Sequence, residues 1–324
     1  MQYRKVGKWG VKVSEVALGS WLTYGGTVEE KNAVKQIHKA FELGINFFDT
    51  ANVYAQGQSE VVVGKALKTM KREACFVATK VFFPMGEGPN DKGLSRKHVF
   101  EQCNASLKRL GQDYVDLYQC HRFDPETPME ELVRTMDDLT RQGKILYWGV
   151  SEWSGSQIED AYRVAAELNA VPPISNQPCY NMLTRNIEAS VIPVCERLGV
   201  GQVVFSPLAQ GVLTGKYAPG KPLPEGSRAA DSRVNMFMMG RSLMSDETLM
   251  KVERLKTIAQ DEGLTLGQMA LAWCLRETNV ASVIIGATKP QQIEENVTAA
   301  GLKLSSEALA KIETILATPA GVRA

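Results

Sequence analysis

The chain of 324 residues is 44% hydrophobic, 23% charged and 7% aromatic, a composition typical of a globular protein. Its formal charge of +1 creates no overall field that would attract nucleic acid or an anionic membrane, so we expect neither as a partner. No segment approaches the roughly 20 apolar residues of a spanning helix, and the opening MQYRKVGKWG lacks the apolar run of a signal peptide. We therefore expect a cytoplasmic protein without membrane insertion.

Along the chain, short apolar runs alternate with segments whose apolar residues recur at helical spacing. Residues 3–12 come first and are predicted to form a hairpin with its turn at 8–10. Eight strand candidates follow, at residues 13–18, 45–50, 75–82, 114–121, 146–151, 174–178, 203–207 and 282–286. A last helix is predicted at 305–316. Glycines at the ends of several helical patterns predict left-handed terminations, and these are Gly44, Gly111, Gly143 and Gly199.

Eight strand-then-helix units predict a (β/α)8 TIM barrel in a single domain spanning residues 1–324. The hairpin would close the floor of the barrel, and the last helix would be an extra C-terminal element. The alternative, an open doubly wound sheet, is disfavoured because no G-x-G-x-x-G motif follows an early strand. Residues 209–245 form the one long irregular segment, and we interpret it as a candidate lid.

The six cysteines lie inside apolar segments without any C-x-x-C pair, which predicts buried free thiols. Neither disulfides nor a metal site are expected. The cysteines stand at positions 75, 103, 120, 179, 195 and 274.

Ionisable side chains stand where predicted strands end. Asp49 follows the second strand, Lys80 lies near the end of the third, His121 closes the fourth, and Tyr54 lies in the second loop. Active sites of such barrels are built from these ends. A phenol donates its proton near neutrality only if a nearby cation lowers its pKa of about 10. We expect Lys80 to be that cation, Asp49 to keep it charged, and His121 to hold the reacting oxygen. Each residue alone has an ordinary structural explanation, and only their joint arrangement indicates catalysis.

The sequence resembles the aldo-keto reductases, whose Asp, Tyr, Lys and His tetrad matches Asp49, Tyr54, Lys80 and His121 in order and spacing. The resemblance covers nearly the whole chain and is carried by GINFFDTANVYAQGQSEVVVGKAL, VATK, GQDYVDLYQCHRFD, GKILYWGVSEWS, NQPCYNML, FSPLAQGVLTGKY and CLRETNVASVIIGATKPQQIEEN. The last two are most similar to the branch that contains the β subunits of voltage-gated potassium channels. Those subunits carry asparagine at the position of His121, so this chain looks more like a bacterial-type enzyme.

This resemblance implies NADPH-dependent reduction of aldehydes, with ketones as a second class, to alcohols. Hydride would come from the nicotinamide and the proton from Tyr54. The implied cofactor-binding residues lie at the nicotinamide (Ser151, Gln177, Phe205), along the pyrophosphate (Ser206, Pro207, Leu208, Gln210, Gly211), at the phosphates (Lys216, Arg228), at the adenosine end (Gly286, Thr288, Gln292, Glu295, Asn296) and on the first two strand ends (Gly19, Ser20, Trp21, Asp49).

Two positions depart from the family pattern. Glu152 replaces an Asn or Arg. Its carboxylate can accept a hydrogen bond from the NH2 group of the nicotinamide carboxamide but cannot donate one. Gln292 replaces an Arg of many NADPH-selective members, so selectivity for the 2′-phosphate depends on fewer charges. A small-molecule carbonyl substrate is the expected partner, and a homo-oligomer is compatible with the sequence.

An apolar substrate pocket suited to aromatic or medium aliphatic aldehydes is expected from Trp21, Tyr54, Phe82, His121 and Trp153, with Tyr24, Phe83 and residues 236–239 as further candidates. Aromatic and methionine clusters are core at least as often.

Three other functions remain to be weighed. A lysine on a barrel strand also forms Schiff bases in aldolases. A cofactor-sensing partner of a membrane channel, with little turnover, is the second alternative, and His121 argues against it. Residues 211–217 resemble a phosphate loop but are one residue short and end in tyrosine where Ser or Thr should bind magnesium, which excludes a nucleotide triphosphatase.

Overall fold

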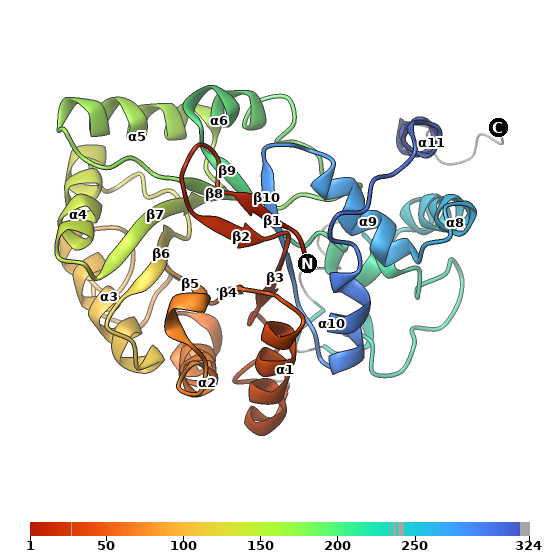
Figure 1. The fold of residues 1–324 in the computed structure, drawn as a ribbon, viewed down its shortest axis with the longest axis horizontal. Coiled ribbons are helices and arrows are strands. Elements are labelled where there is room, and N and C mark those ends of the chain that lie inside the picture. The colour runs from red at the N-terminus through yellow and green to blue at the C-terminus, as the bar shows by residue number, and fades with distance from the viewer. Residues whose placement is uncertain (27, 233, 236–237, 239–242, 318–324) are drawn as a thin grey trace.

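A computed structural model describes residues 1–26, 28–232, 234–235, 238 and 243–317. Eight parallel strands form a closed barrel in the order β10-β3-β4-β5-β6-β7-β8-β9, with helices on the outside (Figure 1). The strands are β3 (Val16–Gly19), β4 (Phe47–Asp49), β5 (Phe76–Val81), β6 (Val115–Cys120), β7 (Ile145–Ser151), β8 (Ser175–Gln177), β9 (Gly201–Phe205) and β10 (Val280–Ile285). The predicted TIM barrel is confirmed.

Most of the helices are amphipathic and bury one face, whereas α9 (Leu266–Leu275) is buried along nearly its whole length. They are α1 (Glu30–Glu42), α2 (Gln58–Leu67), α3 (Arg96–Leu110), α4 (Met129–Arg141), α5 (Gly155–Glu167), α6 (Ile192–Leu198), α8 (Asp246–Asp261), α9 (Leu266–Leu275), α10 (Pro290–Val297) and α11 (Ser306–Ala317). Gly111 and Gly199 end α3 and α6 in the left-handed conformation, with φ of 62° and 77°, as predicted. The extra C-terminal helix is confirmed as α11, which packs against α8 (Figure 1).

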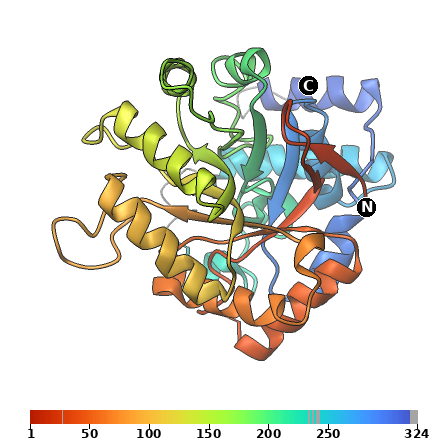
Figure 2. The same cartoon turned by 60° about the vertical axis from the view of Figure 1, so that its left-hand side comes forward.

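The predicted hairpin is formed by β1 (Tyr3–Lys5) and β2 (Lys12–Ser14), which pair antiparallel. Val6 and Val13 on this hairpin pack against Phe47, Phe76 and other side chains inside the barrel, so the hairpin closes the floor. Figure 1 shows it lying across the barrel, and Figure 2 shows it from the side. The apolar contacts exclude water from this end of the barrel.

The prediction of one strand at 13–18 is wrong, because the chain bends at Glu15 between β2 and β3. The Glu15 carboxylate accepts a hydrogen bond from Arg4 at 2.6 Å and another from the Gly301 backbone N–H at 2.6 Å. These distant partners hold the bend, which directs β2 to the floor and β3 into the barrel.

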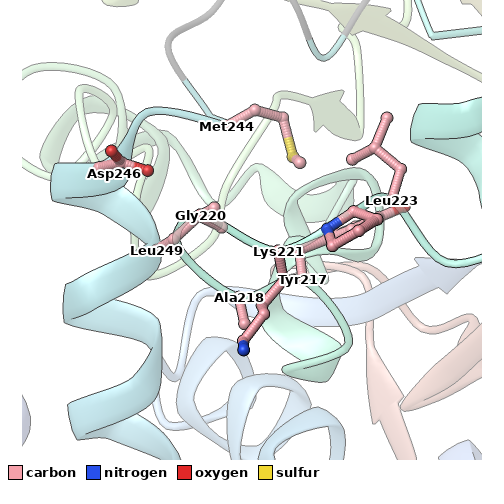
Figure 3. Close-up of a pocket in the computed structure, with 9 residues that line it drawn as sticks. Tyr217, Ala218, Gly220, Lys221, Leu223, Met244, Asp246 and Leu249 are labelled. Carbon is pink, nitrogen blue, oxygen red and sulfur yellow. The ribbon is translucent and has the colours of Figure 1, made fainter.

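The segment 209–245 contains two short 3₁₀ helices among its described residues, η3 (Ala209–Thr214) and η4 (Arg228–Ala230). η3 packs against α8 and α9. Between this segment and α8 lies a hollow of about 220 Å³ (Figure 3), lined by Tyr217, Ala218, Gly220, Lys221, Pro222, Leu223, Met244, Asp246 and Leu249. None of these residues belongs to the predicted catalytic or substrate sets.

Two predictions from composition can be compared with the fold. All six cysteines are buried, and no disulfide joins them in the described part of the chain. Within the described ranges, no helix is long and apolar enough to cross a membrane.

Candidate active site

The four predicted catalytic residues meet at the C-terminal ends of adjacent strands. Asp49 is the last residue of β4, Lys80 is the fifth of the six residues of β5, and His121 directly follows β6. Tyr54 begins the 3₁₀ helix η1 (Tyr54–Gly57) in the loop after β4. Because the strands are parallel neighbours, their ends share one rim of the barrel, as predicted.

Lys80 links the other members of this group. Its fully buried ammonium donates to Asp49 Oδ1 at 2.5 Å, to the Thr50 carbonyl oxygen at 2.8 Å and to the Tyr54 hydroxyl at 3.3 Å. Burial alone would lower the pKa of Lys80, but the charge of Asp49 and the contact with Tyr54 outweigh it and raise this pKa. Lys80 therefore carries its charge at neutral pH.

The second oxygen of Asp49 accepts two further hydrogen bonds. Gln177 Nε2 donates to Oδ2 at 2.9 Å and Gln119 Nε2 at 3.4 Å. Gln119 is not among the site residues expected from the sequence. It stands two residues before His121 on β6 and therefore points to the same face of the strand, which was the available signal.

Tyr54 differs from the expectation in its net pKa. Lys80 lowers the pKa of the phenol as predicted, but burial has the larger effect, and the pKa is raised above its usual value of about 10. The prediction that the net pKa of Tyr54 is lowered is therefore wrong for the protein without ligands. Tyr54 is therefore protonated at neutral pH and holds the proton that it could donate.

His121 is neutral and faces the same space. Burial lowers its pKa well below the usual range, and the charges of Lys80 and Arg122 lower it further. Its ring lies edge-on to Tyr54, with centroids 5.7 Å apart, and to Phe83, at 4.9 Å. Its buried Nδ1 has no hydrogen-bond partner in the described structure, which is an exception among buried polar atoms.

Aromatic side chains surround this group. Trp21 contacts Tyr54 at 6.5 Å between ring centroids, and Phe82 contacts Phe83 at 5.3 Å. Phe83, at the start of the loop that projects between β5 and α3 (Figure 2), contacts His121. The buried Trp153 packs edge-on against Phe123 at 5.1 Å.

The remaining pocket candidates have different positions. Tyr24 is 2% exposed and belongs to the main core, with its hydroxyl donating to Gln36 Oε1 at 3.3 Å. Trp153 has the same exposure and belongs to the same core cluster, so the place of both residues in a substrate pocket stays a prediction. Met238 is fully buried, and residues 236, 237 and 239 lie outside the described residues.

The predicted nicotinamide residues lie on β7, β8 and β9, the next strands around the barrel. The Ser151 hydroxyl donates to the Gln177 carbonyl oxygen at 2.8 Å, and the Glu152 carboxylate accepts from the Cys179 N–H at 2.5 Å. Phe205 is the half-buried last residue of β9. On the other side of the rim, the buried Ser20 hydroxyl donates to Thr50 Oγ1 at 2.9 Å.

Gly19 fits only without a side chain, since a Cβ there would lie 2.7 Å from Ile284 Cγ2. The backbone of the first strand end therefore approaches β10 closely, next to Ser20 and Trp21.

The loop after β9 adopts unusual backbone angles. Ser206, Ala209 and Gln210 have φ of 54°, 47° and 59°, and Gly211 has 96°. Left-handed conformations of non-glycine residues cost free energy and collect at functional sites. Seven of the eight such residues in the described structure lie in loops that follow barrel strands, namely Leu22, Ala55, Gln56, Glu152, Ser206, Ala209 and Gln210, and Asn169 is the exception.

Basic side chains stand beside this loop. Arg228 donates to Gln210 Oε1, and Gln210 Nε2 donates to Ser206 Oγ at 2.6 Å. Burial lowers the pKa of Arg228, and no carboxylate pairs with it in the described part of the molecule. Lys216 is exposed, and its ammonium lies 5.3 Å from the centroid of the Tyr217 ring. A half-buried arginine without an anion, such as Arg228, suits the binding of phosphate, and the exposed Lys216 adds a second positive charge beside the loop.

The predicted adenosine end lies between β10 and α10. Gln292 Oε1 accepts from the N–H groups of Thr288 at 2.7 Å and Lys289 at 3.2 Å, so it caps the start of α10. Asn296 is buried and Glu295 is exposed. These residues, the β9 loop and the predicted nicotinamide residues lie at or after the C-terminal ends of β7, β8, β9 and β10, which are neighbours in the barrel.

The buried His121 provides a prediction about pH. Since its pKa is lowered in the folded state, the unfolded chain binds a proton more readily below the usual pKa of about 6.5. Stability should be fully present above that value and fall as the pH drops below it. The free energy of unfolding, measured by urea denaturation between about pH 7 and pH 5, should fall less steeply in His121→Asn. His98, whose pKa burial also lowers, would leave a residual slope. Identical slopes would mean that His121 is protonated equally in both states.

Comparison with known proteins supports the resemblance to the aldo-keto reductases. The model of the aldo/keto reductase family matches residues 15–317. A probable voltage-gated potassium channel subunit beta of Oryza sativa subsp. japonica is 45% identical over 98% of this chain and 97% of its own length. A protein of the same name from Arabidopsis thaliana is 45% identical over the same shares, 98% and 97%. A putative voltage-gated potassium channel subunit beta of Schizosaccharomyces pombe is 46% identical over 97% and 93%. The chain therefore belongs to the aldo/keto reductase family of oxidoreductases.

Proposed function

We propose that the protein reduces aldehydes, with ketones as a second class, to alcohols with NADPH as the cofactor. The observation that carries this proposal is the buried Lys80, whose ammonium contacts both Asp49 and the Tyr54 hydroxyl next to the neutral His121. Bound NADPH would supply the hydride that reaches the carbonyl carbon.

The side chains supply the proton and the electrostatic environment. As the carbonyl becomes an alcohol, negative charge develops on its oxygen, and Tyr54 gives its hydroxyl proton to that oxygen. Lys80 stabilises the phenolate left behind, because its charge lies 3.3 Å from the Tyr54 oxygen in a site with little water. The neutral His121 can donate a hydrogen bond to the same oxygen. Asp49, held by Gln119 and Gln177, keeps Lys80 charged.

A carbonyl panel tests this proposal directly. Purified protein should oxidise NADPH, followed by its absorbance, in the presence of aromatic or medium aliphatic aldehydes. A matched control is Lys97→Met, which removes an exposed lysine paired with Glu101 on the outer helix α3 and should not change the rate. Failure of every aldehyde and ketone to support turnover would contradict the proposal.

Cofactor selectivity gives a further prediction. Arg228 and Lys216 are proposed to meet the phosphates, while Gln292 caps α10 and brings no charge. The protein should therefore bind NADPH more tightly than NADH, by a modest margin, because each charge-assisted contact is worth about 1.5–3 kcal/mol. Fluorescence titration of Arg228→Ala and Lys216→Met with both cofactors assigns each residue. If a substitution weakens the binding of NADPH and NADH equally, the substituted residue contacts the pyrophosphate. If the wild-type protein binds NADH as tightly as NADPH, the predicted preference for NADPH is wrong.

The Schiff-base alternative is disfavoured by the charge of Lys80. An amine that forms a Schiff base needs a lowered pKa, whereas the pKa of Lys80 is raised by Asp49 despite burial. Borohydride treatment with a keto substrate should therefore give no covalent adduct.

A second candidate function is favoured by the relatives, which are named as potassium channel β subunits and align over nearly their whole length. This chain would then be a cofactor-sensing partner of a membrane channel with little turnover. Co-purification with a channel from membranes, together with no activity toward any carbonyl, would support that function over the reductase.

A further inference from the structure

We propose that Arg122 binds an anionic group of the substrate, so that the preferred substrates are aldehydes that carry a carboxylate. This inference rests on the proposed reductase function and adds the substrate class. Arg122 directly follows His121 at the end of β6 and is half-buried. Its guanidinium lies 5.5 Å from the centroid of the Phe83 ring, and Phe83 in turn contacts His121 at 4.9 Å. The cation therefore stands beside the group that would hold the carbonyl.

The guanidinium has no carboxylate partner in the described structure. Nη1 donates to the His121 carbonyl oxygen at 2.5 Å, which leaves further N–H groups of the planar fork available. Several other partly buried arginines are paired, among them Arg4 with Glu15, Arg72 with Asp116 and Arg109 with Glu60, whereas Arg228 resembles Arg122 and contacts an uncharged amide, that of Gln210. Since removing a cation from water without an anion is costly, this difference points to a ligand.

The acidic residue nearest in sequence is already engaged. Asp124 accepts from the Leu94 N–H at 2.7 Å, from the Thr127 hydroxyl at 2.8 Å and from the Glu126 N–H at 3.0 Å. These bonds hold the ends of two loops at the rim. Asp124 therefore does not neutralise Arg122.

The surroundings of Arg122 fit an organic anion better than a free inorganic one. Phe83 and Phe82 offer aromatic surface, and Trp21 contacts Tyr54 on the other side of the proton donor. The buried Nδ1 of His121 has no partner in the described structure. The Arg122 guanidinium donates to the His121 carbonyl oxygen and lies over the Phe83 ring, which contacts the His121 ring. A carboxylate on Arg122 would thus lie next to a carbonyl at Tyr54.

The alternative is that Arg122 only stacks on Phe83 and holds the His121 backbone. A substrate pair of matched shape separates the two explanations, para-carboxybenzaldehyde and its methyl ester. Wild-type protein should prefer the carboxylate in kcat/KM by about tenfold or more, as expected for a bidentate charge-assisted contact. Arg122→Gln should reduce this preference by about the same factor, mainly through KM, and Arg122→Lys should keep part of it.

Arg96→Gln provides the matched control, because Arg96 is an exposed arginine on α3 that pairs with Asp138. It should leave the carboxylate-to-ester ratio at the wild-type value. If Arg122→Gln lowers the rates for both substrates equally, or if wild type prefers the ester, the proposal is overturned and Arg122 is structural.

Calorimetry separates this proposal from the reductase function itself. Benzoate should bind to wild-type protein more tightly than benzamide, and Arg122→Gln should lose that difference. If neither aldehyde is turned over but this binding pattern holds, the anion site stands and the reductase function fails. Equal binding of benzoate and benzamide to wild type overturns the anion site, whether or not the protein is a reductase.

Discussion

Tyr54→Phe should lower kcat for aldehyde reduction by about a hundredfold or more, since general-acid catalysis contributes about 10²–10⁴. The variant loses only the hydroxyl that lies 3.3 Å from the Lys80 ammonium. Its ring contacts with Trp21 and His121 are those of the phenyl group, so the fold and the affinity for NADPH should barely change. Steady-state kinetics and a fluorescence titration of NADPH measure the two quantities separately.

The interpretation of Tyr54→Phe depends on whether the substitution changes kcat, the affinity for NADPH, or both. A slow variant with normal NADPH affinity identifies the hydroxyl as the proton donor. Near-wild-type turnover would reject Tyr54 in that role and with it the proposed tetrad. Tyr162→Phe is the matched control, because the Tyr162 hydroxyl donates to the Pro173 carbonyl oxygen at 3.0 Å on the floor side, and its loss should not affect kcat.

Lys80→Met should reduce both activity and stability. It leaves the carboxylate of Asp49, which is 4% exposed, without its cation, and breaking one side of a buried ion pair costs about 3–5 kcal/mol. The charge of Lys80 also lowers the pKa of Tyr54. Without it this pKa rises further, and the alkaline limb of the pH–rate profile should move to higher pH.

A double variant separates the two effects. Lys80→Met combined with Asp49→Asn removes both charges, so chemical denaturation should show most of the lost stability restored. Turnover should stay low, because no cation then stands beside Tyr54. Recovery of turnover together with stability would make Lys80 a structural residue.

Much of the barrel could be predicted from local sequence. The strands β5 and β6 are mostly apolar and buried along their whole length, as is typical of strands covered on both faces, and the predicted bounds differ from those observed by one residue at each end. The bend at Glu15 could not be predicted, because it depends on Arg4 and Gly301, which are distant in sequence or on another element. Local patterns carry no information about such contacts.

The sequence indicates which residues meet at the candidate site but does not give their pKa shifts. The order of Asp49, Tyr54 and Lys80 is visible in the sequence, and the structure brings the three into contact. The net pKa of Tyr54 was predicted in the wrong direction, since the dominant effect is burial, which depends on how the loops pack. The position of Gln119, two residues before His121, places it on the same strand face, but its uncharged amide does not reveal which group it contacts, and the structure shows that this group is Asp49.

The hairpin on the barrel floor determines how molecules can enter and leave. With Val6 and Val13 packed among the interior side chains, the floor is covered, and ligands of the proposed site would approach from the rim where β4 and β5 end. In the proposed function, a dinucleotide lying over the loops that follow β7, β8, β9 and β10 would share that rim with the carbonyl compound. Whichever molecule lies deeper must arrive first and depart last. Initial-rate and product-inhibition patterns should therefore show a compulsory order, with the dinucleotide as the leading reactant and the alcohol as the first product released.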